Sequence, residues 1–532
     1  MKNNFTRIPL IAFCMAALMV SCKKSLDLFP QNDVTSEVVY ATALGYKQSL
    51  AKIYGSMALT GNQGPAGQPD VFFPGSDEGA NADFFRSYWK AQELTTDEAV
   101  IAWGDAGIQD FHNMNWTSSN QFLTGVYYKS LYQVTLVNEF LRQSVDGKLS
   151  ERNISGADAE TIRKYRAEVR FLRAFQYSIL MDLFGNPPFI TEANEIGGQN
   201  PAQIKRTDLF TYVETELKAI EADLPAARTN DYGRVDQAAA WALLARVYLN
   251  AEVYIGTPKY TEAITYSKKV IDAGYTLTPN YRHLMLADNH LNKNEFILTI
   301  NYDGAKTQGF GGTTFLTHAS IGGSISAASA GVNSGWGGIR TTKALVQKFT
   351  DPSGNTDKRA QFYMSGQNLE IGTQTTFTEG YAITKYKNIT RTGVGGKNIE
   401  FVDIDMPLFR LPEMYLVYAE AVRRGGTGGD LAQALTYLNS LRARAYGSSA
   451  GNINTGEMTL QFILDERARE LYWEGFRRTD LIRYKQFTEN TYLWPWKGGV
   501  PGGAGVAAFR NLFPLPSSDI NANTNLVQNA GY

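Results

Sequence analysis

Apolar side chains recur every three or four positions through much of the chain, a spacing that predicts amphipathic helices. In the segment 158–184, the residues of one apolar face are Tyr165, Val169, Leu172, Ile179 and Leu183. The arginines expected to lie off this face are Arg163, Arg166, Arg170 and Arg173. A helix with this pattern packs its apolar face on neighbouring helices.

Comparable helical patterns are expected at about 122–145, 158–184, 207–224, 235–253, 260–273, 411–424, 430–446 and 459–476. Several of these helices form pairs with a short loop between them. Across one pair, small and aromatic residues alternate as in a tetratricopeptide unit, and a generic helical hairpin is the alternative. The predicted fold is mostly α: a tetratricopeptide-like helix-pair scaffold (an α-α superhelix) decorated by irregular loops and short strands.

The pattern changes between 276 and 409, where Gly, Thr, Ser and Asn dominate and only short pieces such as "EFILTI" and "YAITKYKN" resemble strands. Residues 61–119 and 486–532 are similarly irregular. We predict one domain over 35–532, with a helical scaffold at about 35–60, 120–275 and 410–485. The three irregular segments are expected to be insertions, which commonly carry binding surfaces.

The N-terminus has the pattern of a cleaved export signal. Lys2 and Arg7 precede an apolar stretch at 8–20, and Ser21 stands directly before Cys22. This pattern predicts a signal peptide over 1–21 that is cleaved at a lipoprotein box, with lipid attached to Cys22. The stretch is shorter than the about 20 apolar residues of a transmembrane helix. Residues 22–34 would then be a lipidated tether; an ordinary secretory signal is the alternative.

Charge and cysteine content exclude some functions. Lys and Arg number 51 and Asp and Glu 52, and no block of like charge interrupts this balance. A nucleic-acid partner requires a basic stripe, so no such partner is expected. The only cysteines are Cys14 and Cys22, so the mature body is expected to have neither a disulfide nor a cysteine-ligated metal.

Catalytic motifs have little support. The "GSSAG" motif around Ser449 matches GxSxG, but a helical pattern precedes it where a nucleophile elbow needs a strand, so we interpret it as a loop. Glu466, Glu470 and Glu474 share a helix face, but arginines of the same segment supply cationic partners. Such partners lower the pKa of a carboxyl group, whereas a general acid needs a raised pKa. We therefore predict that the protein is not an enzyme.

Four stretches together resemble the SusD/RagB family of glycan-binding outer-membrane lipoproteins. They are the lipoprotein box followed by "LDLFP", "AEVRFLRAFQYSILMDLFGNPPFI", "LPEMYLVYAEAVRRGG…DLAQALTYLNSLRARA" and "ILDERARELYWEGFRRTDLIRYKQF". More narrowly, "DEGANADFFRSYW", "LTTDEAVIAWGDA", "GFGGTTFL", "NSGWGG" and "YLWPWKGG" are similar to a starch-binding member. The resemblance implies helix pairs that dock on a SusC-like TonB-dependent transporter, with a glycan site on the opposite, insertion-built face.

The same resemblance implies that an arc of three aromatic rings cradles an α-glucan. The matching residues are Trp103, Phe310 and Trp336. Phe310 replaces a tyrosine of the starch-binding member, so the ring is kept and a hydroxyl is lost. A pyranose has apolar C–H faces ringed by hydroxyls, which suit an aromatic platform with a few polar groups. Core packing is the alternative for each ring.

Polar contacts to the sugar are also implied by the resemblance. The residues that match hydrogen-bonding partners of sugar hydroxyls are Arg86, Asp77 and Asp105. Ala106 stands where the starch-binding member has asparagine, and Gln109 is the candidate replacement.

A structural calcium ion is a further expectation from the resemblance, and no other cofactor is expected. The candidate oxygen ligands are Asp288, Asn292, Asp403 and Asp405. His290 occupies a position that is acidic in the starch-binding member. Solvated loop carboxylates are the alternative.

The expected function is therefore capture of starch or maltooligosaccharides by a lipid-anchored protein on the outer face of the outer membrane, with delivery to a SusC-like transporter. A binder of another glycan or of peptides is the first alternative. A glycan hydrolase and a helical scaffold that binds proteins alone are the others.

The lipid anchor gives a direct prediction. Replacing Cys22 (Cys22→Ala) is expected to release the protein from membranes, because no other apolar segment of the sequence is long enough to hold it there. Palmitate incorporation and membrane fractionation measure the effect. Membrane association of the variant in cells that lack the transporter would contradict the anchor.

Overall fold

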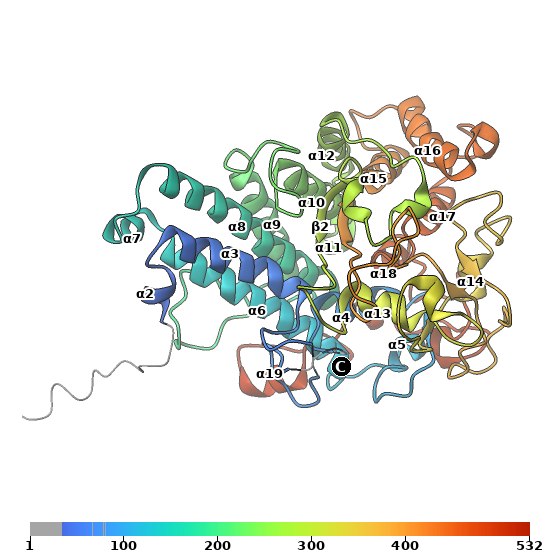
Figure 1. Cartoon of the computed structure of the whole chain (residues 1–532), viewed down its shortest axis with the longest axis horizontal. Helices are drawn as coiled ribbons and strands as arrows, with labels where there is room; N and C mark the ends of the chain where they lie inside the picture. The colour runs from blue at the N-terminus through green and yellow to red at the C-terminus, as the bar shows by residue number, and fades with distance from the viewer. Residues whose placement is uncertain (1–34, 66, 78, 80) are drawn as a thin grey trace, which may run out of the picture.

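The computed structural model describes residues 35–532 except 66, 78 and 80, so the predicted signal peptide, Cys22 and the tether lie outside the described residues. The described chain is mostly helical (Figure 1). None of the described helices is both long enough and apolar enough to cross a membrane.

Long helices pack side by side in the N-terminal part of the scaffold (Figure 1). They are α3 (Ala43–Ala58), α6 (Gln121–Gln143), α8 (Gly156–Phe184) and α9 (Arg206–Ile220), with the short α2 (Ser36–Val39) and α7 (Asp146–Glu151). Helix α8 packs on α6, α9 and α3. Thr35 is the N-cap residue of α2.

Helix pairs continue in the C-terminal part of the scaffold. They are built from α10 (Gln237–Leu249), α11 (Ala251–Ile255), α12 (Tyr260–Asp272), α15 (Leu411–Arg423), α16 (Leu431–Tyr446), α17 (Leu460–Leu471) and α18 (Arg477–Arg483). Helix α10 packs on α12, α12 on α15, and α15 on α16. Successive packing of paired helices confirms the predicted fold class.

Short strands and helices form the segments between the scaffold helices. Antiparallel pairs join β1 (Val100–Ile101) to β3 (Ile339–Arg340), β2 (Phe296–Ile300) to β6 (Met406–Arg410), and β4 (Phe362–Tyr363) to β5 (Ala382–Ile383). The helices here are α4 (Phe84–Glu93), α5 (Asp110–Asn113), α13 (Gly312–Ala319), α14 (Lys343–Val346) and α19 (Ser517–Ala522). The predicted strand in "EFILTI" is β2.

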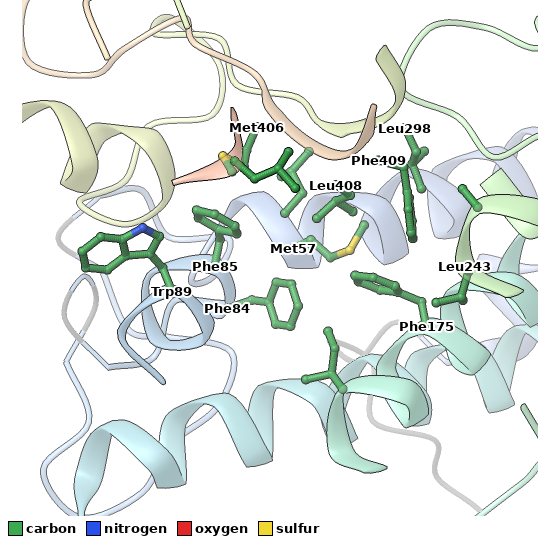
Figure 2. Close-up of a cluster of buried hydrophobic side chains, with 14 of the residues drawn as sticks. Met57, Phe84, Phe85, Trp89, Phe175, Leu243, Leu298, Met406, Leu408 and Phe409 are labelled. Atoms are coloured by element: carbon green, nitrogen blue, oxygen red, sulfur yellow. The ribbon is translucent and has the colours of Figure 1, made fainter. Parts of the chain in front are cut away.

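The interpretation of 61–119 as wholly irregular is wrong, because this segment contains α4 at the centre of the core. Figure 2 shows Phe84, Phe85 and Trp89 of α4 among apolar side chains of α3, α8, β2 and β6. All residues of α4 except Tyr88 are buried. The sequence of α4 does have an apolar face, with Phe84, Phe85 and Trp89, and polar residues beside it. The polar residues are buried as well, which an amphipathic pattern does not predict.

The predicted apolar face of α8 is buried, and one of the arginines beside that face is buried as well. Arg173 is only 2% exposed. Its guanidinium pairs with the carboxylate of Glu192 and, at 3.2 Å, with that of Glu216. A buried arginine with two carboxylate partners cannot be recognised from helical spacing alone.

A cluster of buried ion pairs joins the strands to the C-terminal helices. Arg410 contacts Glu470 at 2.6 Å, Glu474 at 2.7 Å and Glu295 at 3.2 Å. Arg444 pairs with Glu295 at 3.1 Å and with Glu470. Burial acts to raise the pKa of Glu470, but the surrounding guanidinium groups outweigh it and lower that pKa to about 2. The carboxylates of this helix face have cationic partners, but those of Glu470 come from other segments of the chain, whereas the sequence predicts them in its own segment. Glu466 does pair with Arg469 of the same segment, at 2.7 Å.

We expect Glu470→Gln to lower the free energy of unfolding by about 3–5 kcal/mol, because it leaves buried guanidinium charge uncompensated. Asp272→Asn, which breaks the exposed pair with Lys268, should change it by less than about 1 kcal/mol. Urea unfolding measures both. The loss of unfolding free energy caused by Glu470→Gln should become smaller as pH falls from about 4.5 toward 2, where the native carboxylate is protonated. A loss of unfolding free energy that stays constant over this pH range would contradict the stabilising role of the Glu470 ion pairs.

Candidate functional site

The three predicted rings lie together, although they come from distant segments. Trp103 follows β1 and Trp336 precedes β3, and the pairing of these strands brings the two residues side by side. The Trp103 and Trp336 ring centroids are 6.4 Å apart, and those of Phe310 and Trp336 are 6.3 Å apart. Trp336 is therefore the central ring of this aromatic arc, defined as Trp103, Trp336 and Phe310.

All three rings of the arc are half-buried, so each has a packed face and a solvent-accessible part. The indole Nε1–H of Trp103 donates to the main-chain oxygen of Trp336 at 3.0 Å. Its ring also lies 6.0 Å from that of the buried Phe315. Neither simple core packing nor full exposure describes these side chains.

Two glycines allow the backbone to approach the rings. A Cβ atom at Gly338 would lie 2.6 Å from ring atoms of Trp103, and one at Gly79 would lie 2.6 Å from Cβ of Phe310. Any larger residue at either position would displace the ring above it.

Arg86 of α4 is a buried support for the arc. It is 6% exposed, and its Nη1 donates to the main-chain oxygens of Gly79 at 2.7 Å and Phe310 at 2.9 Å. The guanidinium carbon lies 5.5 Å from the Trp103 ring centroid and 5.9 Å from that of Trp336. Burial lowers the pKa of Arg86 to about 10, so the group stays cationic at neutral pH. Its predicted contact with sugar stays a prediction.

The other predicted polar residues lie around Trp103 and Phe310. Asp105 and Ala106 are exposed, two and three residues after Trp103. Asp77 is half-buried and accepts a hydrogen bond from the Gly79 N–H at 3.0 Å. Gln109, the candidate replacement for the missing asparagine, donates its amide to the main-chain oxygen of Trp103 at 3.0 Å. This contact fixes the backbone of the arc.

The calcium candidates fall into two differently bonded pairs. Asp288 forms an ion pair with Arg391 at 3.0 Å, and Asn292 accepts from the same guanidinium at 3.2 Å. In contrast, Asp403 and Asp405 accept hydrogen bonds from main-chain N–H groups at 2.8 Å.

Asp288, Asp403 and Asp405 line one cavity of about 540 Å³. Burial raises the pKa of Asp405 to about 6. Among the described residues, no three or more His, Cys, Asp or Glu side chains are grouped so that they could hold a metal ion. Calcium binding stays a prediction.

Ser449 lies in a 3-10 turn, Ser449–Gly451, that follows α16. The motif is thus not at a strand-to-helix elbow, which agrees with its interpretation as a loop.

His318 is a site residue that the sequence reasoning missed. The imidazole of this α13 residue stacks on the Trp336 ring, with centroids 4.7 Å apart and an interplanar angle of 20°. The sequence gives no spacing signal for it, because its partners are a ring 18 residues later and main-chain oxygens.

The packing of Trp103 on the backbone can be tested with two neighbouring glycines. Gly338→Ala should displace the Trp103 ring, alter the near-ultraviolet circular dichroism of the tryptophans and cost about 1–3 kcal/mol of stability. Gly104→Ala is the matched control, because a Cβ atom there has no neighbour within 4 Å. An unchanged spectrum for Gly338→Ala would contradict this packing.

Comparisons with known proteins agree with the architecture. A profile described as "SusD family" matches residues 351–532, and one described as "Starch-binding associating with outer membrane" matches residues 70–249. The "Starch-binding protein SusD" of Bacteroides thetaiotaomicron is 36% identical over 582 aligned positions that cover 100% of both chains.

Solved structures show the same fold. A SusD superfamily protein from Parabacteroides distasonis has a TM-score of 0.69 at 22% identity, covering 92% of this chain and 98% of the other. Surface glycan-binding protein A from Bacteroides thetaiotaomicron, in complex with laminarihexaose, has a TM-score of 0.66 at 21% identity, covering 91% and 98%. Because the identity to a curated relative reaches 36% over its full length, the chain belongs to the SusD family.

Proposed function

We propose that this protein binds a neutral glycan through the aromatic arc. The observation that carries the proposal is the contact of three half-buried rings, Trp103, Trp336 and Phe310, at one surface. Adjacent rings match the apolar faces of successive pyranose units, and the exposed Asp105 beside Trp103 supplies an acceptor for sugar hydroxyls.

Starch or another α-glucan is the proposed ligand. A relative that is 36% identical over the whole chain is named a starch-binding protein, and the profile over 70–249 is also described as starch-binding. The three rings predicted from the starch-binding resemblance meet in one arc, which supports this choice. A β-glucan is the second candidate, because a structural neighbour was solved with laminarihexaose.

A shallow aromatic site implies weak binding. Burial of about 250 Å² of apolar surface, at about 25 cal/mol per Å², contributes about 6 kcal/mol before the costs of association. The expected dissociation constant for one site is therefore about 0.1–1 mM.

Outer-membrane association and the partner are part of the proposal. The profile over 70–249 is described as associating with the outer membrane, and the lipoprotein box at Cys22 supplies a means of attachment. The protein would face the exterior and pass its glycan to a SusC-like TonB-dependent transporter. It would not cleave the glycan, since Glu466 and Glu470 have lowered pKa values that suit ion pairing and disfavour general acid catalysis.

Removal of one ring tests the site. Trp103→Ala is expected to abolish retention on an amylopectin affinity gel. Each ring contributes about 1–3 kcal/mol to a total binding free energy of only a few kcal/mol. Some loss of thermal stability is expected as well, since the ring is half-buried. Trp241→Ala is the matched control: this half-buried tryptophan on α10 donates to Glu221 at 2.8 Å and lies outside the arc.

Retention of Trp103→Ala on the gel equal to that of Trp241→Ala would refute the arc as the binding site. The same gels cast with starch, dextran, inulin, xylan or laminarin separate the two candidate ligands. Retardation by the laminarin gel alone would show that the ligand is a β-glucan and not an α-glucan.

A further inference from the structure

The central ring of the aromatic arc rests on a fully buried histidine. His318 has no exposed surface, and its imidazole stacks on the indole of Trp336. The main-chain oxygen of His318 also accepts the N–H of Trp336 at 2.9 Å. His318 therefore contacts Trp336 through both its ring and its backbone.

Both nitrogens of the imidazole face acceptors. Nδ1 lies 2.7 Å from the main-chain oxygen of Ser334, and Nε2 lies 2.9 Å from that of Glu400. Neither oxygen can donate a hydrogen bond. A neutral imidazole has one N–H and one lone pair, so it can satisfy only one of these contacts, whereas an imidazolium satisfies both.

These two contacts connect three segments of the site. Ser334 lies two residues before Trp336, and Glu400 precedes Phe401, whose ring is 5.5 Å from that of Phe310. His318 itself lies on α13, which begins two residues after Phe310. Protonation of one side chain would thus strengthen the connections between the segments that carry two rings of the arc.

The charged groups around His318 are few. The exposed Glu400 carboxylate favours the imidazolium, and Arg86 of α4 lies 5.9 Å from the Trp336 ring centroid. The segment 334–336 and the rest of α13 carry no charged side chain. Burial is the largest influence and lowers the pKa of His318 below its usual value, although both carbonyl contacts act to raise it. The imidazole is therefore neutral at neutral pH.

We propose that His318 is a positioning residue whose protonation fixes Trp336 in its binding position, so that the arc binds glycan more tightly in mildly acidic solution. The imidazolium donates to both carbonyl oxygens and adds a cation–π contact to the indole. Linkage requires the converse, so bound glycan raises the pKa of His318. This inference rests on the proposed glycan site.

Titration of the mature protein tests the inference. We expect maltoheptaose, measured by calorimetry, to bind about fivefold or more tightly at pH 5 than at pH 8. His318→Gln should remove this pH dependence, because glutamine does not titrate. His283→Gln is the matched control, since this half-buried histidine also has a lowered pKa. Its imidazole contacts Asn280 at 3.0 Å and belongs to none of the segments that carry the arc, so its replacement should leave the profile unchanged.

A signal from the imidazole itself keeps the test independent of folding defects in the variant. The chain has four histidines, so the His318 resonance can be assigned by its loss in His318→Gln. Its titration should move an indole signal of Trp336 in the free protein and shift to higher pH when maltoheptaose is added.

The outcomes separate this inference from the proposed function. Equal affinity at both pH values, weaker binding at pH 5, or a His318 titration that leaves Trp336 unaffected would overturn the role of His318 while leaving the glycan site in place. Absence of glycan binding at every pH would refute the proposed function instead, and coupled titration of His318 and Trp336 would still support the positioning contact.

Discussion

Buried arginine–carboxylate pairing is the constraint on which the rest of this structure depends. Arg410 at the end of β6 meets three carboxylates from two distant parts of the chain, and one of them, Glu474, also pairs with Lys385 at 2.6 Å. A buried ion without its partner costs several kcal/mol, so these segments are stable only when they meet. The strands are thereby fixed against the C-terminal helices, although the hydrogen bonds of two-stranded sheets alone would hold them weakly.

The connection from this cluster to the surface runs through α4. Glu93, at the end of that helix, accepts the main-chain N–H of Gly475 at 2.7 Å, next to Glu474 of the ion cluster. Near the other end of the same helix, Arg86 holds the main-chain oxygens of Gly79 and Phe310. A rigid helix thus relates the interior charge cluster to the position of the aromatic arc, and the side chains between Arg86 and Glu93 are buried except that of Tyr88.

Much of the scaffold could be predicted from sequence because its helices are half-buried. The expected helix at 411–424 is α15 at Leu411–Arg423, and the expected 430–446 is α16 at Leu431–Tyr446. Two features were not predicted. One is the ten-residue α4, whose short amphipathic pattern stands between irregular segments, and the other is the burial of Arg173, which depends on distant carboxylates. The arc is a third case: Trp103 and Trp336 are joined by strands of two residues, too short to recognise, so only the family resemblance placed them together.

The close approach of backbone to ring at Gly338 and Gly79 has a consequence for how such a surface can diversify. Loops that end in a glycine beneath an aromatic residue fix the height of that residue above the scaffold, whatever the rest of the loop contains. Lengthening the outer part of a loop, or substituting its residues, would then change which sugar substituents are tolerated. The spacing of the rings would stay the same. The outer loop residues would determine specificity, and the backbone beneath the rings would determine their spacing.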